Sequence, residues 1–316
     1  MKSFLSKYIE KLYFKKWVIG ICQYDIKDII RNKTFDGDIK WLKDNSFDKF
    51  DADPFPLSSN DSYFKILIEE FIKKEGYAKI SLLTLAKGNS HIQIKPLLKT
   101  KSHLSYPFIY RENEKVYVFP ESSKNGKLSC YEFIPSSESL VFVKDILNLP
   151  LKDSTIIKHN DKFWIIGSIA DDNSNYILQV FYSNELLGLY YPHPLNGKIK
   201  GLDGIRPAGN IFEVDGVLYR PSQNCKNKYG ESITINKVNQ LNEINFEEEP
   251  YMEITINNKK KNNYGIHCIH TINAIDNFII VDGQYWLFSP NHQIKQYLNS
   301  DIKKYFTRKI FPDGKK

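Results

Sequence analysis

The sequence predicts an all-β protein, a five-bladed β-propeller with a short N-terminal helix. Short runs of alternating apolar and polar residues, bounded by polar turns, recur along the chain, and sustained helical periodicity is scarce after residue 45. A hairpin pattern also repeats five times at a spacing of about 45–65 residues, the size of one four-stranded propeller blade. Both observations favour five similar units arranged in a ring.

Each repeat consists of an inner strand, a polar turn and an aromatic-rich returning strand. The returning strands read YFKILI, KVYVF, KFWII, GVLY and NFIIVD, beginning at residues 63, 115, 162, 216 and 277. Five residues mark the same place at the start of the inner strands, namely Asp53, Tyr106, Asp153, Arg206 and His270. A β-sandwich is the alternative architecture, but it does not explain a register that repeats.

The chain divides into a basic helical segment at 1–16, the propeller at 17–300 and a basic tail at 301–316. The strand pattern at 17–21 is expected to close the ring by pairing with the last blade near 285–288. Because the repeats and the N-terminal segment account for the whole chain, no second domain is expected.

The N-terminal segment carries apolar residues at helical spacing with lysines around them. The simplest interpretation is a short helix that packs on the propeller, and the alternative is a basic amphipathic helix that contacts an anionic membrane surface. The segment lacks the apolar core of a signal peptide, and no apolar stretch is long enough to span a membrane. We therefore expect a cytoplasmic protein, with membrane association as the alternative.

Composition excludes several classes of protein. The chain has 316 residues, and Lys+Arg 44 against Asp+Glu 37 leaves a net charge of +7, too mild an excess to indicate a nucleic-acid partner. Four cysteines stand far apart, which favours free thiols over disulfides.

No cofactor or metal is expected either. The sequence has no GxGxxG motif after a strand, no P-loop and no HExxH motif. The HCIH string at 267–270 suggests a metal site, but His267 and His270 would point to opposite faces of a strand.

The five register marks are candidate site residues because the innermost strands of a propeller line its channel. Asp53 and Asp153 are candidate catalytic carboxylates, while Arg206, His270 and Tyr106 are candidate substrate contacts. Charged groups in apolar strands are costly to bury unless they bind a ligand or one another. The alternative is purely structural, with Arg206 neutralising the two aspartates.

A second group of polar residues lies one strand later in each repeat. Glu69, Glu70 and Glu121 end outgoing strands, and Glu70 and Glu121 are candidate catalytic acids. Arg206 and Arg220 together would form a planar clamp for a phosphate or carboxylate. The remaining candidate substrate contacts are Gln223, Tyr229 and Asp282. This mixture suits a carbohydrate or nucleotide-sugar substrate with an anionic group.

Several motifs resemble a known module, the five-bladed N-terminal domain of plant glucosamine inositolphosphorylceramide transferase. Bacterial relatives of that module occur in surface-polysaccharide gene products. The resemblance covers roughly residues 17–290 and rests on ADPF (52–55), SYPF (105–108), FPES (119–122), IRPAGN (205–210), LYRPSQNC (218–225), GIHCIHT (265–271) and VDG (281–283).

The module is similar in turn to five-bladed glycosidases of the arabinanase, xylosidase and fructosidase type. That resemblance implies that Asp53 and Asp153 correspond to two of their carboxylates. Their third carboxylate, the general acid, falls where this sequence has Arg206. Hydrolysis by two carboxyl groups needs an acid opposite the base, so Glu121 or Glu70 would have to supply it.

These observations favour a carbohydrate-active enzyme of surface-glycan biosynthesis. We expect glycosyl transfer that involves an anionic or phosphorylated sugar donor or a lipid-linked acceptor, with Asp53 as the base. The first alternative is a glycoside hydrolase with a displaced general acid. The second is a propeller that binds glycans without catalysis.

Overall fold

The structure is a computed structural model. It describes residues 13–88, 92–171, 176–201, 203–256, 260, 263 and 265–288. The tail expected at 301–316 and most of the expected N-terminal segment, residues 1–12, lie outside the described residues. Among the residues described, no helix has the length and apolar character that a membrane span requires.

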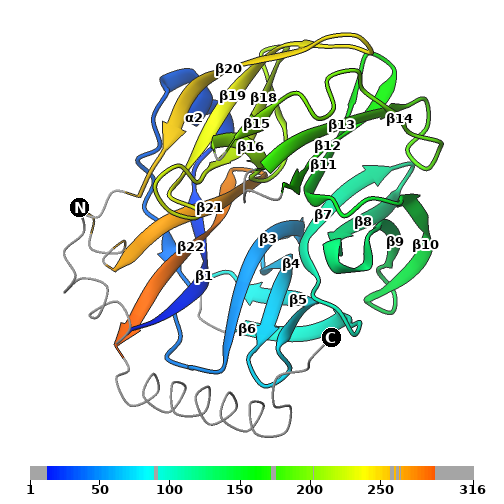
Figure 1. The fold of residues 1–316 in the computed structure, drawn as a ribbon. Helices are drawn as coiled ribbons and strands as arrows, with labels where there is room; N and C mark the ends of the chain where they lie inside the picture. The colour runs from blue at the N-terminus through cyan, green and yellow to red at the C-terminus, as the bar shows by residue number, and fades with distance from the viewer. Residues whose placement is uncertain are drawn as a thin grey trace, which may run out of the picture.

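Five antiparallel sheets surround a central axis, which confirms the predicted five-bladed propeller (Figure 1). The first blade contains β3 (Lys49–Ser59), β4 (Tyr63–Ile72), β5 (Tyr77–Ala86) and β6 (Ile92–Leu98). The second contains β7 (Ser105–Glu112), β8 (Lys115–Glu121), β9 (Leu128–Ile134) and β10 (Ser139–Leu147). A short 3-10 turn, η1 (Ser123–Asn125), follows β8.

The remaining blades follow in chain order around the ring. The third contains β11 (Lys152–His159), β12 (Lys162–Ala170), β13 (Tyr176–Ser183), β14 (Tyr191–Pro192) and β15 (Lys200–Gly201). The fourth contains β16 (Asp203–Pro207), β17 (Phe212–Val214), β18 (Val217–Asn224), β19 (Ser232–Leu241) and β20 (Phe246–Ile254). The fifth contains β21 (Ile266–Ile275), β22 (Phe278–Phe288), β1 (Tyr13–Gln23) and β2 (Lys40–Trp41).

The predicted ring closure is confirmed, because β1 pairs antiparallel with β22 over its full length. The strand begins at Tyr13, however, so residues 13–16 are not helical as expected from their spacing. Lys16 is buried, and its ammonium group bonds to Asp44 and Ser46. Pairing with β22 and this buried contact stabilise a strand there, and tertiary structure overrides the local pattern.

The short helix of the described chain lies after β1 rather than before it. Helix α2 (Ile26–Asn32) begins at Asp25, whose side chain accepts a hydrogen bond from the Lys27 amide at 2.8 Å. It buries Ile29 and Ile30 in a core cluster shared with the fourth and fifth blades.

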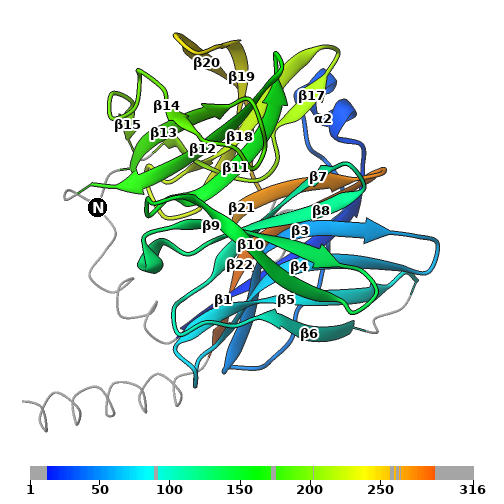
Figure 2. The ribbon, with the colours of Figure 1, turned by 90° about the vertical axis from the view of Figure 1, so that its right-hand side faces the viewer.

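The inner strands β3, β7, β11, β16 and β21 surround the axis, and the side view shows β3, β7 and β21 running next to one another (Figure 2). Each inner strand has a register irregularity at its predicted mark. Three of the marked residues, Asp53, Tyr106 and Asp153, have φ angles of 47°, 45° and 52°. A bulge of this kind re-aims a side chain that regular pleating would direct elsewhere.

The channel is filled below these bulges, so the site is a cavity at one mouth and not a pore. The Tyr106 ring is fully buried, and its hydroxyl lies 3.0 Å from the Thr155 hydroxyl and 2.7 Å from the Gly209 amide. Gly209 has φ 125°, and a Cβ there would lie 2.0 Å from the Ile272 carbonyl oxygen. Only glycine allows this close approach between the fourth and fifth blades.

We expect Gly209→Ala to lower the free energy of unfolding by more than about 3 kcal/mol, because backbone strain and a backbone clash add at this position. Gly216→Ala is the matched control, since Gly216 also has a positive φ but has open space where the Cβ would be. It should cost about 1 kcal/mol. Urea unfolding of both variants measures the difference, and equal costs would contradict the role given to Gly209.

Candidate functional site

A cavity of about 280 Å³ lies at the mouth of the channel and receives side chains from all five blades. Six predicted site residues line it: Asp53, Glu121, Asp153, Arg206, Tyr229 and His270. A larger cavity of about 550 Å³ lies at the seam between β1 and the first blade and contains none of these six. The convergence expected from the repeated register is therefore observed.

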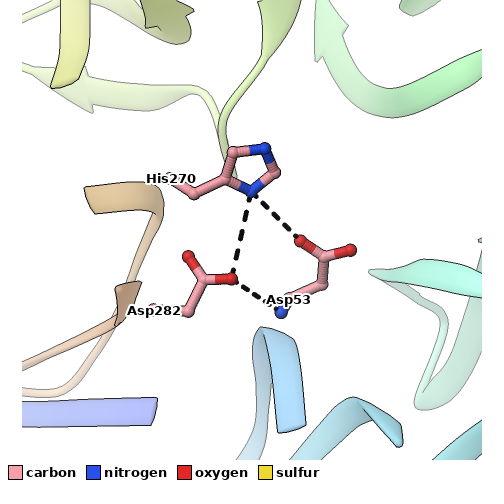
Figure 3. A group of neighbouring side chains, drawn as sticks. All are labelled: Asp53, His270 and Asp282. Carbon is pink, nitrogen blue, oxygen red and sulfur yellow. Dashed lines mark hydrogen bonds and ion pairs between the residues drawn. The ribbon is translucent and has the colours of Figure 1, made fainter. Parts of the chain in front are cut away.

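On one side of the cavity, His270 lies against two buried carboxylates (Figure 3). Its Nδ1 atom is 3.6 Å from an Asp53 oxygen and 3.9 Å from an Asp282 oxygen. Asp282 accepts hydrogen bonds from the Asp53 amide at 3.0 Å and from the Thr271 amide at 2.8 Å. Asp53 in turn accepts a hydrogen bond from the Tyr106 amide at 3.0 Å. Asp282 thus positions the backbone of Asp53 and does not line the cavity itself.

Mutual pairing sets the charges of this group. Burial by itself would lower the pKa of His270, but the adjacent Asp53 and Asp282 carboxylates outweigh it and raise that pKa. Burial would likewise raise the pKa of Asp53, but interaction with His270 outweighs it and lowers that pKa. Their mutual attraction thus favours the ionised carboxylate of Asp53 and the protonated imidazole of His270 over the neutral forms.

Glu69, and not the predicted Glu70, lines the cavity next to Asp53. Neighbouring residues of a strand point to opposite faces, so only one of the two glutamates can face the channel. Glu70 instead accepts a hydrogen bond from Ser81 at 2.7 Å and pairs with Lys79 at 3.5 Å. Burial and the Asp53 carboxylate together raise the pKa of Glu69 well above its usual value. Glu69 therefore holds its proton more tightly than an ordinary glutamate does, next to the Asp53 carboxylate.

Glu121 lies in the cavity as predicted. It accepts hydrogen bonds from the Asp153 amide at 3.2 Å and from the Ser123 hydroxyl at 2.9 Å. Burial, and then the Asp153 carboxylate, raise the pKa of Glu121 to about 7. Near neutral pH, Glu121 can accordingly donate or accept a proton.

Arg206 forms a buried pair with Asp153. Its Nε atom donates to Asp153 Oδ2 at 2.6 Å, and the Gln223 amide donates to the same oxygen at 3.0 Å. Its guanidinium carbon lies 4.9 Å from the centre of the Tyr176 ring and 5.3 Å from that of Tyr229. The structural alternative given above was that Arg206 neutralises the two aspartates. Arg206 does pair with one of them, Asp153. Gln223 supports this pair from β18.

Two other predicted substrate contacts lie away from the cavity. Arg220 is fully buried and donates to both oxygens of Glu248 and to the Gly204 carbonyl. It stands three residues before Gln223, and an odd spacing on a strand directs the two side chains to opposite faces. The predicted clamp of Arg206 and Arg220 is therefore wrong. Tyr106 is also fully buried inside the ring, so it cannot contact a sugar.

The sequence reasoning did not identify eight further residues that line the cavity, namely Trp17, Phe50, Ala52, His103, Ser105, Ser123, Lys124 and Lys152. Trp17 belongs to the strand that closes the ring. Its sequence pattern predicted pairing with the last blade but did not indicate that the side chain lines the cavity. Lys152 directly precedes Asp153, one of the five predicted marks. That position in the sequence was the signal that could have identified Lys152 as a cavity residue. The His270 ring lies 5.0 Å from both the Trp17 and Tyr229 rings, which builds an aromatic wall.

Asp53, His270 and Asp282 could also surround a metal ion, because one ligand atom from each lies within 4.8 Å of the others. Both Asp282 oxygens and one Asp53 oxygen already accept hydrogen bonds from backbone amides. A protonated His270 would offset the negative charge of Asp53 and Asp282, as a metal ion would. The expectation that no metal binds here stays a prediction. His267, from the HCIH string, stacks on Trp286 at 4.2 Å.

We expect the raised pKa of Glu121 to appear in the pH dependence of stability. A carboxyl group whose pKa rises on folding contributes stability that is fully present below its ordinary value of 4.5 and is lost as pH rises through about 7. The free energy of unfolding of the wild type, relative to Glu121→Gln, should therefore fall by roughly 1–3 kcal/mol between pH 5 and pH 8. Urea unfolding at the two pH values measures it. A difference that does not change with pH would contradict the assignment.

Comparison with known proteins is consistent with this fold. The chain is 35% identical over 168 residues to glucosamine inositolphosphorylceramide transferase 1 of Arabidopsis thaliana, covering 51% of this chain and 22% of that protein. It is 28% identical over 208 residues to the protein of that name from Oryza sativa subsp. japonica, covering 64% of this chain and 28% of that protein. The matches thus span less than a third of either relative.

Among solved structures, a family 117 glycoside hydrolase of Zobellia galactanivorans has a TM-score of 0.52 and 12% identity, covering 89% of this chain and 93% of that one. At that identity the likeness shows the shared fold alone. Residues 42–277 match the family described as glucosamine inositolphosphorylceramide transferase 1, N-terminal. This match covers most of the chain, from the first blade into the fifth, and the protein belongs to that family.

Proposed function

We propose that this propeller is a carbohydrate-active enzyme that transfers a glycosyl group in surface-glycan biosynthesis. The observation that carries the proposal is the cavity itself, which Asp53, Glu69 and Glu121 all line. Pairing with His270 favours the ionised form of Asp53, whereas burial raises the pKa of Glu69 and of Glu121. A base and an acid in one cavity are what transfer at an anomeric carbon requires. Membership of a family named for a sugar transferase supports the choice of transfer.

In the proposed reaction, Asp53 accepts the proton of an acceptor hydroxyl. The hydroxyl oxygen then bonds to the anomeric carbon of the donor while the bond from that carbon to the leaving oxygen breaks. Glu69 or Glu121 donates a proton to the leaving oxygen, which balances the proton taken by Asp53. His270 keeps Asp53 ionised before the reaction, because its positive charge favours the carboxylate.

The aromatic wall of the cavity suits a sugar ring. Trp17 and Tyr229 both line the cavity and flank the His270 ring. Aromatic faces present apolar area to the C–H groups of a sugar, while carboxyl groups bind its hydroxyls. The substrate that we propose is a carbohydrate or nucleotide sugar, with a phosphorylated donor or a lipid-linked acceptor. A cytoplasmic location and membrane contact through the N-terminal segment belong to the same proposal.

Hydrolysis is the second candidate function, because the same pair of Asp53 and Glu69 could activate water in place of an acceptor hydroxyl. The third, glycan binding without catalysis, uses the same cavity but requires no proton transfer. The candidates differ in their products: a glycoside, a free sugar or an unchanged ligand.

The test is a turnover screen with nucleotide sugars and charged oligosaccharides. We expect Asp53→Asn to lower kcat by more than about 100-fold, since it removes the base. Asparagine tolerates the left-handed backbone of position 53, so the fold should persist. Glu69→Gln should lower kcat by about tenfold or more, because the acid is lost.

Glu70→Gln is the matched control, since Glu70 neighbours Glu69 on β4 but faces Ser81 and Lys79. Its kcat should stay within about twofold of the wild type, as expected for a residue without contact to the reacting atoms. Free sugar as the sole product would favour hydrolysis. Ligand binding without any turnover by the wild type would overturn the catalytic assignment.

A further inference from the structure

Two lysines on the Glu121 side of the cavity have positive charges that the protein does not fully neutralise. Lys124 lies in the η1 turn after β8 and makes no hydrogen bond or ion pair with the residues that the structure describes. The Lys152 ammonium is 3.8 Å from Glu121 Oε1, too long for a hydrogen bond, and about a third of its side chain is exposed. Both line the cavity.

The positive field of these lysines reaches the neighbouring His103. Burial, and then the charge of Lys124, lower the pKa of His103, with a smaller contribution from Lys152 and partial opposition from Asp53. The His103 Nδ1 atom accepts a hydrogen bond from the Ala78 amide at 3.2 Å, so its Nε2 atom carries the proton and points to Glu69 at 3.2 Å. His103 is thus a neutral donor at the edge of a positive region.

Arg206 and Arg220, which the sequence predicts as a clamp for an anion, are already engaged by other groups of the protein. Arg206 uses Nε and Nη2 for Asp153, and its Nη1 donates to the hydroxyls of Tyr176 and Tyr229. Arg220 is fully buried against Glu248. An anion that binds Arg206 would have to break a buried pair. Lys124 has no such pair among the described residues, and Lys152 has only the 3.8 Å contact with Glu121. Of the described cationic side chains that line the cavity, Lys124 and Lys152 are therefore more available to an anion than Arg206.

We propose that Lys124 and Lys152 form a subsite for the phosphoryl group of a phosphorylated sugar. The subsite deepens the proposed function and rests on it, because it assumes that the sugar occupies the adjacent cavity. Two ammonium groups match the double negative charge of a phosphate monoester, and lysine binds phosphate as a compact point charge. This position places the phosphate beside Glu121, which could supply a proton to it as it leaves.

The experiment measures binding to the full chain by isothermal titration calorimetry. The probes are the 1-phosphates of glucose, galactose and N-acetylglucosamine, with the three parent sugars, glucuronic acid and inorganic phosphate for comparison. We expect at least one sugar phosphate to bind about tenfold more tightly than its parent sugar, as befits a charge-assisted contact. The gain should shrink at high salt, because the lysines are partly exposed.

The double variant Lys124→Ala/Lys152→Ala should remove that gain and leave affinity for the parent sugar unchanged. The control is Lys27→Ala/Lys198→Ala, which removes the same charge from exposed positions outside the cavity and should change nothing. Thermal unfolding of both double variants checks that they fold like the wild type.

The outcomes separate the two proposals. Equal affinity for sugar phosphate and parent sugar, unchanged in the double variant, would overturn the subsite and leave the carbohydrate site standing. Inorganic phosphate that binds through the two lysines while no sugar binds would overturn the proposed function but keep an anion site. Glucuronic acid that binds as tightly as the sugar phosphates would overturn the assignment to phosphate. No binding of any probe would overturn both.

Discussion

Charged side chains can converge at the centre of this ring only because each inner strand departs from regular pairing at the same place. Four of these register irregularities direct Asp53, Asp153, Arg206 and His270 to one channel mouth, and the fifth accompanies the buried Tyr106. Left-handed backbone at Asp53 and Asp153 is part of the cost. Ring closure by β1 and the buried Tyr106 side chain hold the strands in this geometry, so the site depends on the whole propeller.

Burial of so many ionisable groups is tolerated because their charges are divided unequally. Asp53 and Asp153 are each paired with a cation, His270 and Arg206, and burial favours the protonated form of Glu69 and Glu121. The low dielectric that makes an unpaired charge costly thus favours the ionised form of Asp53 and disfavours that of Glu69. The same arrangement that makes the buried cluster stable supplies the base and acid of the proposed reaction.

Much of this architecture could be predicted from the sequence, because propeller blades are local repeats and their periodicity survives without knowledge of the third dimension. The blade number, the closing strand and the five marks all follow from it. The choice between Glu69 and Glu70 could not, since a one-residue shift in register exchanges the faces of a strand. The partner of Arg220 lies on β20, and Lys124 reaches the cavity from a short turn; neither contact has a periodic signal.

The unequal protonation of the cavity carboxyl groups is the central claim, and a carbon-13 NMR titration of the glutamate side-chain carboxyls tests it most directly. Comparison of the wild type with Glu69→Gln and Glu121→Gln assigns the two signals. We expect the Glu69 carboxyl to remain protonated at neutral pH and the Glu121 carboxyl to titrate near pH 7. Titration of both groups near 4.5, the ordinary value for glutamate, would contradict the account.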